Sequence, residues 1–407
     1  MIDPRDYGID NLPLGIISDE QHARRRPAVA FEDKVVDLDA LVHRGTLDAP
    51  SLLGAATLND FLGEGPVVWR AVRARLRHLL GAGANGGERA AVVASMLPRE
   101  AVTMHLPIAI GDYVDFYSSL AHATNVGRIL RPNAEPLPPN YRHVPIGYHG
   151  RSGTVVVSGT PVRRPHGQTK APDAALPAFG PSAMLDVEVE MGWIAGPGSV
   201  HGEPIPPDAV REHVFGYVLL NDWSARDIQA WEYQPLGPFL AKSFATSISP
   251  WIVSLDALEP FRSAEPAREP EPLPYLRARE SWAYDIELQL LLQSERMRAR
   301  GHPPLTIART NLRGMYWTLA QQLAHVTSNG ASLRPGDLFG TGTISGEEPG
   351  TEGSLLELTR RGANRIALPG GETRGFLEDG DTVIIRGRAV RGAARVGFGE
   401  VTGTVAG

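Results

Sequence analysis

LDVEVEM, at residues 185–191, places Glu188 and Glu190 two positions apart among apolar side chains. Side chains alternate between the two faces of a strand, so both glutamates share one face and the valines the other. A second apolar run, VFGYVLL at residues 214–220, predicts another core strand and leads to Asp222. Carboxylates on core strands are costly to bury unless a cation neutralises them. An all-carboxylate set suits a hard divalent ion such as Ca²⁺ or Mg²⁺, and a solvated strand face is the alternative.

The segment that follows these strands, SARDIQAWEY at residues 224–233, predicts a helix. Helical spacing puts Arg226, Gln229 and Tyr233 on one face. A cation, an amide and a phenol beside carboxylates favour a site for a polar, anionic organic substrate, although an ordinary amphipathic helix would show the same spacing. Lys242 is a single charge in an apolar, hydroxyl-rich run, and we expect it to lie near the carboxylates rather than extend to solvent.

A third group of candidates lies earlier, in GDYVDFYSSLAHATNVG at residues 111–127. Asp115 precedes a predicted short helix that Gly127 would end. His122 follows, with a tyrosine, Tyr117, five residues before it and Asp115 seven residues before it. A lone histidine is usually structural, so His122 becomes a catalytic candidate only through these neighbours.

Composition excludes several classes of function. The 407 residues are 42% hydrophobic and 21% charged, which is typical of a globular protein, and the length favours two domains. A net charge of −6 gives no electrostatic footprint for nucleic acid or an anionic membrane. The absence of cysteine excludes disulfides, a thiolate zinc site and a cysteine nucleophile. Neither a secretory signal nor a bilayer-spanning apolar stretch is visible, so we expect a cytoplasmic protein.

The distribution of turn residues predicts the domain organisation. The chain contains 44 glycines and 34 prolines, which favours short strands and many turns over a helical bundle. Residues 1–106 mix strand-like runs with short helices and predict a small accessory domain, whereas residues 107–407 contain the candidate site. The glycines of LRPGDLFGTGTISG, at residues 333–346, do not fit a nucleotide-binding pattern. Glu357 is a single acid in an apolar run and needs a partner if it is buried.

Several long segments together resemble the fumarylacetoacetases of the fumarylacetoacetate hydrolase family. They are DYVDFYSSLAHATNVG, PIGYHGR, LDVEVEM, LNDWSARDIQAWEYQPLGPFLAKSF, MYWTLAQQL and LRPGDLFGTGTISG. The resemblance implies a mainly β (β-rich α+β) fold, with a small SH3-like N-terminal barrel, a larger C-terminal domain of mixed, rolled sheet, and a homodimer. It also implies hydrolysis of a carbon–carbon bond of 4-fumarylacetoacetate, a small diketo dicarboxylate, to fumarate and acetoacetate. That reaction is the last step of tyrosine and phenylalanine catabolism.

The resemblance further implies a role for each matching residue. The ligands of Ca²⁺ would be Asp115, Glu188, Glu190 and Asp222, and a second, Mg²⁺-like site would use Asp222, the main-chain carbonyl of Lys242, and Thr246. His122 would be the catalytic base and Glu357 its orienting acid, with Arg226, Gln229 and Lys242 as donors to the developing oxyanion. Substrate contacts would come from Tyr117, Arg131, Tyr148, Gln229, Tyr233 and Thr343. Ala241 and Ala245 stand where the family commonly has glycine, which adds methyl groups near the second ion.

Two other functions stay open at this point. An acylpyruvate hydrolase or 2-oxo acid decarboxylase of the same superfamily would share the glutamate pair and Asp222, yet such relatives generally lack the segment around His122 and the N-terminal domain. A metal-stabilised binding protein without catalysis would use the ion only to neutralise buried acids. It would have no need for a paired His122 and Glu357.

Overall fold

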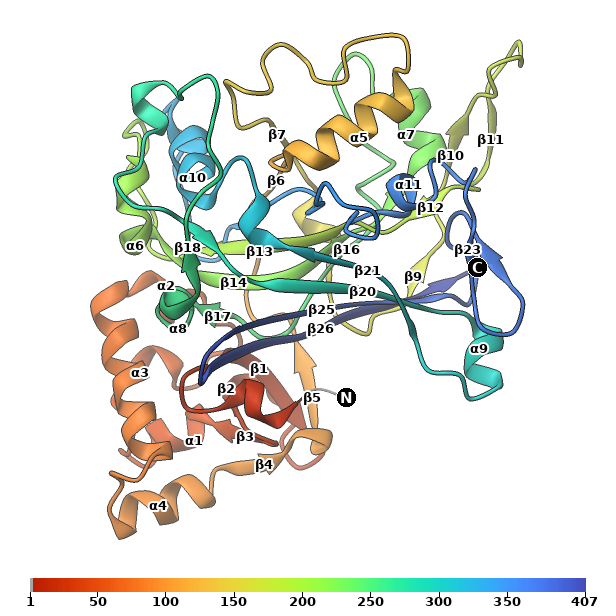
Figure 1. Cartoon of the computed structure of the whole chain (residues 1–407). Helices are drawn as coiled ribbons and strands as arrows, with labels where there is room; N and C mark the ends of the chain where they lie inside the picture. Colours follow the sequence, from red (N-terminus) through yellow and green to blue (C-terminus); the bar gives the residue numbers. More distant parts are fainter. Residues whose placement is uncertain (1–2) are drawn as a thin grey trace.

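Apolar runs in the first 105 residues form a five-stranded antiparallel sheet, drawn in red and orange at the bottom of Figure 1. The computed structural model describes residues 3–407 of the chain. The sheet has the order β4-β3-β2-β1-β5, with β1 (Leu14–Asp19), β2 (Arg26–Phe31), β3 (Lys34–Asp37), β4 (Met96–Pro98) and β5 (Val102–His105). It is accompanied by the helices α1 (Leu38–His43), α2 (Asn59–Gly63), α3 (Pro66–Leu80) and α4 (Gly86–Val93).

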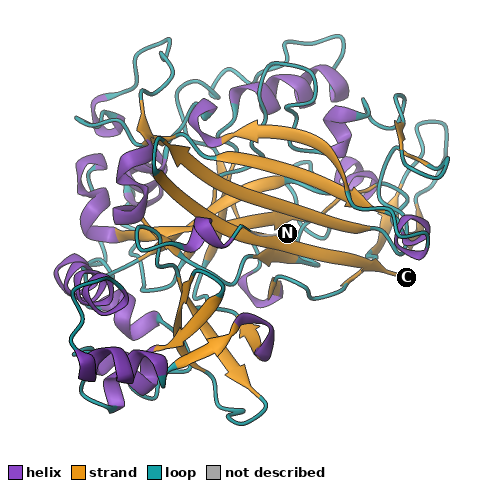
Figure 2. Ribbon diagram, turned by 60° about the horizontal axis from the view of Figure 1, so that its bottom comes forward, coloured by secondary structure: helices purple, strands orange, loops and turns teal. Residues whose placement is uncertain are grey.

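The rest of the chain is built on two larger sheets (Figures 1 and 2). The first has eight strands in the order β7-β6-β22-β13-β14-β16-β8, with β17 also paired to β14. Its strands are β6 (Tyr113–Phe116), β7 (Gly147–His149), β8 (Val155–Val157), β13 (Val189–Ala195), β14 (Val214–Asp222), β16 (Thr246–Ile248), β17 (Val253–Ser254) and β22 (Leu338–Gly340). The sheet is mixed, because β22 pairs parallel with β6 and β16 with β8, whereas β13 and β14 are antiparallel.

The second large sheet has five strands in the order β21-β20-β25-β26-β9. They are β9 (Val162–Arg163), β20 (Glu287–Gln293), β21 (Leu305–Asn311), β25 (Thr382–Arg391) and β26 (Ala394–Ala406). Strand β14 of the first sheet contacts both β25 and β26, so the two sheets meet there. Gly387 on β25 permits this approach, since a Cβ atom at that position would lie 2.6 Å from the side chain of Leu219.

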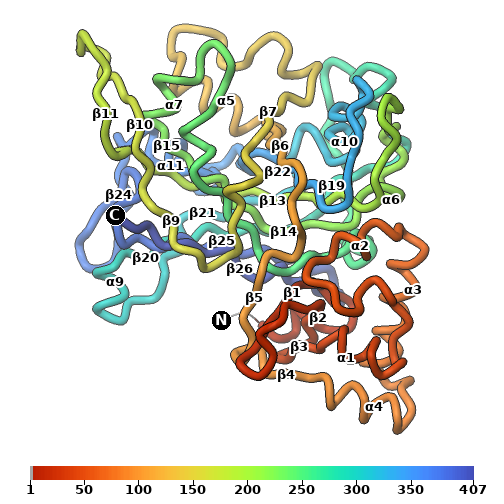
Figure 3. Tube along the Cα trace, turned by 180° about the vertical axis from the view of Figure 1, so that it is seen from behind, coloured from red at the N-terminus to blue at the C-terminus, as the bar shows by residue number. Residues whose placement is uncertain are grey.

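Short strand pairs and helices surround the two sheets. The pairs are β10 (His166–Thr169) with β11 (Ala178–Pro181), β12 (Leu185–Asp186) with β15 (Ser224–Ala225), β18 (Arg262–Ser263) with β19 (Ala283–Tyr284), and β23 (Ile366–Ala367) with β24 (Thr373–Arg374). The helices are α5 (Leu120–Leu130), α6 (Val210–His213), α7 (Arg226–Glu232), α8 (Leu255–Leu258), α9 (Glu295–Ala299), α10 (Leu319–Thr327) and α11 (Leu355–Leu358). The β10–β11 hairpin projects from the edge of the molecule in Figure 3.

Strand β14 is buried on both faces, which explains its almost continuous apolar sequence. Tyr217 and Leu219 pack into the core between the two large sheets. Val218 and Leu220, on the opposite face, pack with apolar side chains of the N-terminal sheet. The strand therefore joins two cores and delivers Asp222 from a fixed position.

The structure confirms the mainly β fold and corrects two local predictions. Residues 185–191 are not one strand: β12 ends at Asp186 and β13 begins at Val189, because β12 pairs with β15 whereas β13 pairs with β14 and β22. The prediction that Gly127 ends a helix is also wrong, since α5 continues to Leu130. Gly127 instead allows a close approach, as a Cβ atom there would lie 1.9 Å from the carbonyl oxygen of Pro136.

None of the helices in residues 3–407 combines the length and the apolar character that crossing a bilayer requires. The division into domains at residues 106 and 107 stays a prediction. The N-terminal sheet and the first large sheet share one cluster of buried apolar side chains, so packing alone does not separate them.

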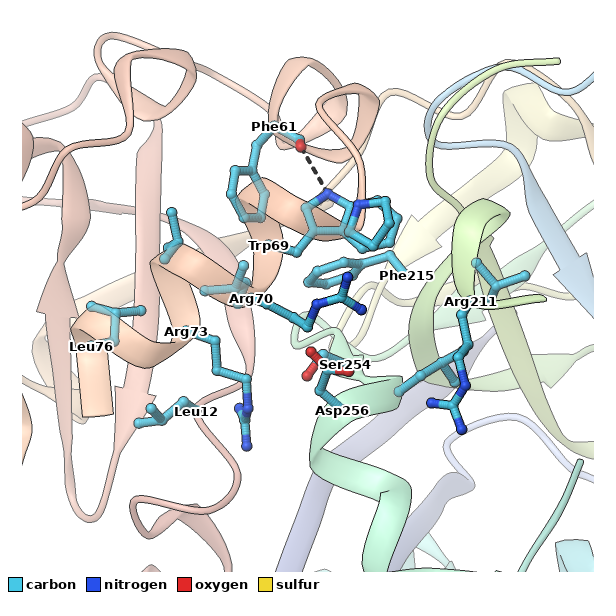
Figure 4. A pocket seen from close by; sticks show the side chains of 15 residues that line it. Leu12, Phe61, Trp69, Arg70, Arg73, Leu76, Arg211, Phe215, Ser254 and Asp256 are labelled. Carbon is cyan, nitrogen blue, oxygen red and sulfur yellow. Dashed lines mark hydrogen bonds between the residues drawn. The ribbon is translucent and has the colours of Figure 1, made fainter. Parts of the chain in front are cut away.

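Trp69 anchors the contact between α3 and the first large sheet (Figure 4). Its indole Nε1 donates to the carbonyl oxygen of Phe61 at 3.0 Å, and its ring meets that of Phe215 edge-on, with 5.1 Å between ring centroids. A cavity of about 40 Å³ lies beside these rings. That volume holds water-sized molecules only, so the contact is structural.

Replacing Trp69 with alanine should lower the free energy of unfolding by about 3–5 kcal/mol, because it removes a buried aromatic ring and enlarges an existing cavity. Denaturant-induced unfolding measures this loss. Val67→Ala on the same helix is the matched control, since Val67 is 75% exposed and its change should be small. Equal effects of the two substitutions would contradict the anchoring role of Trp69.

Candidate metal centre and active site

Four buried carboxylates from three strand segments converge beside the first large sheet. They are Asp115 on β6, Glu188 just before β13, Glu190 on β13, and Asp222 at the end of β14. One carboxylate oxygen from each lies within 4.8 Å of the others. The order β6-β22-β13-β14 brings these distant residues together, because β22 fills the space between β6 and β13.

Gly340 on β22 creates the space that the cluster needs. A Cβ atom at this position would lie 2.5 Å from Oδ1 of Asp115 and 3.0 Å from Oε2 of Glu190. The backbone N–H of Gly342 donates to the same two oxygens, at 3.2 and 3.1 Å. Gly340 and Gly342 both belong to the segment 333–346, which does not fit a nucleotide-binding pattern. In the structure they make room for the carboxylates and donate a backbone hydrogen bond to them.

Lys242 lies among the carboxylates and does not extend to solvent. Its Nζ atom is 2.5 Å from Oε2 of Glu188 and 2.8 Å from Oδ2 of Asp222. The hydroxyl of Tyr148 donates to the same Asp222 oxygen at 2.8 Å, and Thr246 donates to the other oxygen at 3.2 Å. A cavity of about 670 Å³ opens next to this group and is lined by Tyr148, Asp222, Lys242 and Thr246 among others.

The acids of the cluster carry more negative charge than the side chains around them neutralise. Burial raises the pKa of Asp115, and the charge of Asp222 raises it further. Burial also raises the pKa of Glu190, and Asp115 adds to the effect. Glu188 differs: burial raises its pKa, but Lys242 and Arg226 together lower it below the usual value.

These residues fit a divalent cation. Burial and mutual repulsion disfavour the charged forms of Asp115 and Glu190, and a bound cation would favour them. Oε1 of Glu190 is buried and has no hydrogen-bond partner among residues 3–407. Four oxygen ligands, one of them with an open coordination direction, are the donor set that Ca²⁺ and Mg²⁺ prefer.

His122 and Glu357 form a buried pair, although 235 positions separate them in the sequence. Ser119 caps α5 and accepts a hydrogen bond from the backbone of His122 at 3.2 Å, which fixes the start of the helix. Nδ1 of His122 lies 2.6 Å from Oε2 of Glu357. The other Glu357 oxygen accepts from Asn125 at 3.0 Å.

The Glu357 carboxylate is charged in this arrangement. Burial raises its pKa, but His122 and the surrounding hydrogen-bond donors, Asn125 and Ser354 among them, lower it below the usual value. A charged carboxylate only accepts hydrogen bonds, so Nδ1 of His122 is the donor to Oε2 of Glu357. This leaves Nε2 as the ring atom of His122 that does not contact Glu357.

The remaining predicted residues differ in how closely they approach the cluster. Tyr117 packs edge-on against His122, with 5.3 Å between ring centroids. Thr343 is buried, and its hydroxyl has no partner within the described part of the chain. Gln229 accepts from Nη1 of Arg226 at 3.2 Å through its side-chain oxygen.

Arg131 and Tyr233 each follow the last residue of a helix. Arg131 follows the last residue of α5 and donates to the carbonyl oxygen of Pro136 at 2.8 Å. Tyr233 follows α7 and is 38% exposed. Neither forms a hydrogen bond or ion pair with the carboxylate cluster in residues 3–407.

Sequence reasoning missed several residues of this region. Asp186 is buried and pairs with Arg226 at 2.8 Å, and Asn125 and Ser345 both donate to Glu357. The signal for Asp186 was present, because the spacing of two that links Glu190 to Glu188 extends back to it. No local pattern marks Asn125 or Ser345. Their shared partner, Glu357, is distant from Asn125 in the sequence and lies across a turn from Ser345.

A hydrolytic enzyme of mainly β fold is the class of protein that these features indicate, because a carboxylate cluster that fits a divalent cation and a buried histidine–carboxylate pair are typical of enzymes that activate water. Known proteins identify the family. The model for the fumarylacetoacetate hydrolase C-terminal domain matches residues 113–406, and the model for the fumarylacetoacetase N-terminal domain matches residues 10–107. The chain belongs to the fumarylacetoacetate hydrolase family.

Curated relatives place the chain more narrowly within that family. It is 47% identical over 406 residues to the fumarylacetoacetases of Rattus norvegicus and Homo sapiens, covering 98% of this chain and 96% of each relative. It is 45% identical over 410 residues to the fumarylacetoacetase of Arabidopsis thaliana, covering 98% and 95%. Among solved structures, fumarylacetoacetate hydrolase from Exiguobacterium antarcticum shares the fold, with a TM-score of 0.54, 16% identity, and coverage of 97% and 99%.

Proposed function

We propose that this chain catalyses the fumarylacetoacetase reaction, the hydrolysis of 4-fumarylacetoacetate to fumarate and acetoacetate at the end of tyrosine and phenylalanine catabolism. The observation that carries the proposal is the buried His122–Glu357 pair together with the four-carboxylate cluster, since His122 is near enough to lower the pKa of Glu188 electrostatically. The relatives that share 47% of its residues along almost the whole chain support the same reaction.

Asp115, Glu188, Glu190 and Asp222 would hold Ca²⁺, and Asp222, the carbonyl of Lys242, and Thr246 would hold Mg²⁺. When bound, a divalent ion would supply Lewis-acid chemistry to polarise the carbonyl group that is attacked. The methyl groups of Ala241 and Ala245 are buried in apolar clusters with Ile228 and the main core, which is compatible with the second site.

His122 prepares the nucleophile. Its Nε2 takes a proton from water, and the water oxygen forms a bond to the carbonyl carbon. Glu357 holds the Nδ1 proton in place and stabilises the imidazolium that results. The carbon–carbon bond then breaks, and its electron pair stays on the acetoacetate carbon until a proton reaches that carbon.

Three donors stabilise the negative charge that develops. The Arg226 guanidinium can only donate, so the oxygen of Gln229 faces it and the amide nitrogen of Gln229 is directed elsewhere and available to substrate. Burial lowers the pKa of Lys242, but Asp222 and Glu188 raise it above the usual value, so its ammonium is charged. Two of its three N–H groups have carboxylate partners, and we assign the third to the oxyanion or to protonation of the leaving carbon.

Substrate recognition follows from the same region. Arg131 and the hydroxyls of Tyr117, Tyr148 and Tyr233 would bind the two terminal carboxylates, and Thr343 offers a buried hydroxyl without a protein partner in residues 3–407. The homodimer and the cytoplasmic location stay predictions from the sequence.

The direct test follows the ultraviolet absorbance of the diketone in the presence of the protein, with and without a chelator. We expect absorbance to fall, acetoacetate to appear in equal amount, and the chelator to stop both. Release of pyruvate from an acylpyruvate, with 4-fumarylacetoacetate unchanged, would favour the related hydrolase. A chelator-sensitive melting temperature with no diketone consumed would indicate a binding protein without catalysis.

A further inference from the structure

Asp186 has a buried carboxylate that belongs to neither the metal cluster nor the His122 pair. It is the last residue of β12 and has no exposed surface. Its oxygens accept hydrogen bonds from Nε of Arg226 at 2.8 Å and from the backbone N–H groups of Val187, Leu355 and Leu356 at 2.8, 2.7 and 3.0 Å. Both oxygens face only donors, a set that a carboxylate alone can satisfy.

One side of Asp186 fixes the guanidinium of Arg226. With Nε held by Asp186, the Nη2 atom reaches Oε1 of Glu188 at 2.8 Å as an ion pair, and Nη1 donates to Gln229 at 3.2 Å. The contact with Glu188 lacks the alignment of a hydrogen bond, so it does not hold the guanidinium plane by itself. Asp186 therefore sets the direction in which Arg226 orients the Gln229 amide.

The other side of Asp186 fixes the helix that carries Glu357. Leu355 and Leu356 are the first two residues of α11, and Glu357 is the third. Their N–H groups bind the two Asp186 oxygens separately, which restricts both the position and the tilt of this short helix. The 2.6 Å contact between Glu357 and His122 depends on that position.

We propose that Asp186 is a positioning residue that couples the two halves of the active site: the His122–Glu357 base, and the Arg226–Gln229 donors. The inference rests on the proposed function, because it needs both halves to act on one substrate. One carboxylate sets both, so a disturbance at Asp186 affects proton removal and oxyanion binding together.

Asp186→Asn tests this with an isosteric change. In either orientation, the NH₂ group of the asparagine would face two of the four N–H donors that now bind Asp186. We therefore expect kcat to fall about 10- to 100-fold, while KM and metal affinity change less than about 3-fold. Asp227→Asn is the matched control, because Asp227 lies next to Arg226 and accepts from Ser182 and Ala183 without contacting either half. Its kcat should stay within about 2-fold of the unaltered protein.

Double variants separate coupling from a general loss of stability. Combined with Glu357→Gln or with Arg226→Gln, the Asp186→Asn change should reduce kcat less than it does in the unaltered protein, since one of its routes is already broken. If, in both double variants, kcat falls by the full product of the losses in the two single variants, the proposal is overturned. If the unaltered protein consumes no diketone, the proposed function fails; if it does and Asp186→Asn keeps its kcat, only this inference fails.

A second pair of variants tests the helix side without altering Asp186. Leu355→Pro removes one N–H donor to Asp186 at the first position of α11, where proline is tolerated, and Leu355→Ala removes the side chain but keeps the N–H. We expect the proline variant to have a kcat about 10-fold below that of the alanine variant. Equal kcat values in the two folded variants would show that the hydrogen bond does not position Glu357.

Discussion

Replacement of His122 by alanine is expected to lower kcat by about 10²- to 10⁴-fold, because among residues 3–407 no other side chain hydrogen-bonded to Glu357 is a base that can accept a proton from water. The other side chains bonded to Glu357 are those of Asn125, Ser345 and Ser354, and each donates a hydrogen bond to it. Metal content should be unchanged, since His122 is not one of the four clustered carboxylates. Steady-state hydrolysis of the diketone and metal analysis of the purified variant measure the two quantities.

The control for this substitution is His201→Ala, which removes an exposed imidazole that lies far along the chain from the pair. It should keep normal turnover. Appreciable activity in the His122 variant would mean that another group removes the proton. A simultaneous loss of metal would mean instead that His122 takes part in the metal centre.

Replacement of Asp222 by alanine is expected to remove both metal and turnover. Asp222 lies within reach of the other three carboxylates and also accepts from Lys242, Tyr148 and Thr246. Its loss deletes a ligand and leaves these donors unpaired.

Thermal unfolding with and without added Ca²⁺ tests this expectation. Metal at about 100 times its dissociation constant should stabilise the unaltered protein by about 2.7 kcal/mol and should leave the Asp222 variant unchanged. Asp173→Ala removes an exposed carboxylate and should respond to Ca²⁺ like the unaltered protein. A variant that keeps its metal and its activity would exclude Asp222 from the ligand set.

The sequence predicted those parts of the fold that depend on local patterns. The apolar run at 214–220 became β14, and the polar face at 226–233 became α7, with bounds within two residues. The break after Asp186 and the continuation of α5 past Gly127 were missed, because both depend on contacts with residues distant along the chain. The first arises because β12 pairs with β15 whereas β13 pairs with β14 and β22, and close packing against Pro136 explains the second.

The candidate site depends even more on contacts between residues that are distant in the sequence. The spacing of Glu188 and Glu190 indicated a carboxylate pair, but nothing local joined Asp115 to them. That proximity arises because β22 inserts between β6 and β13. Likewise, the roles of His122 and Glu357 came from a resemblance, and only the fold brings their side chains to 2.6 Å.

The double burial of β14 has a consequence for how the sequence can diverge. Val218 and Leu220 meet the N-terminal sheet, while Asp222 ends the same strand at the carboxylate cluster. A bulkier residue at either apolar position would push the strand sideways unless a residue opposite it became smaller. A change to a larger side chain at Val218 or Leu220 therefore needs a compensating change to a smaller side chain in the N-terminal sheet. The N-terminal sheet and β14 are thus expected to change together.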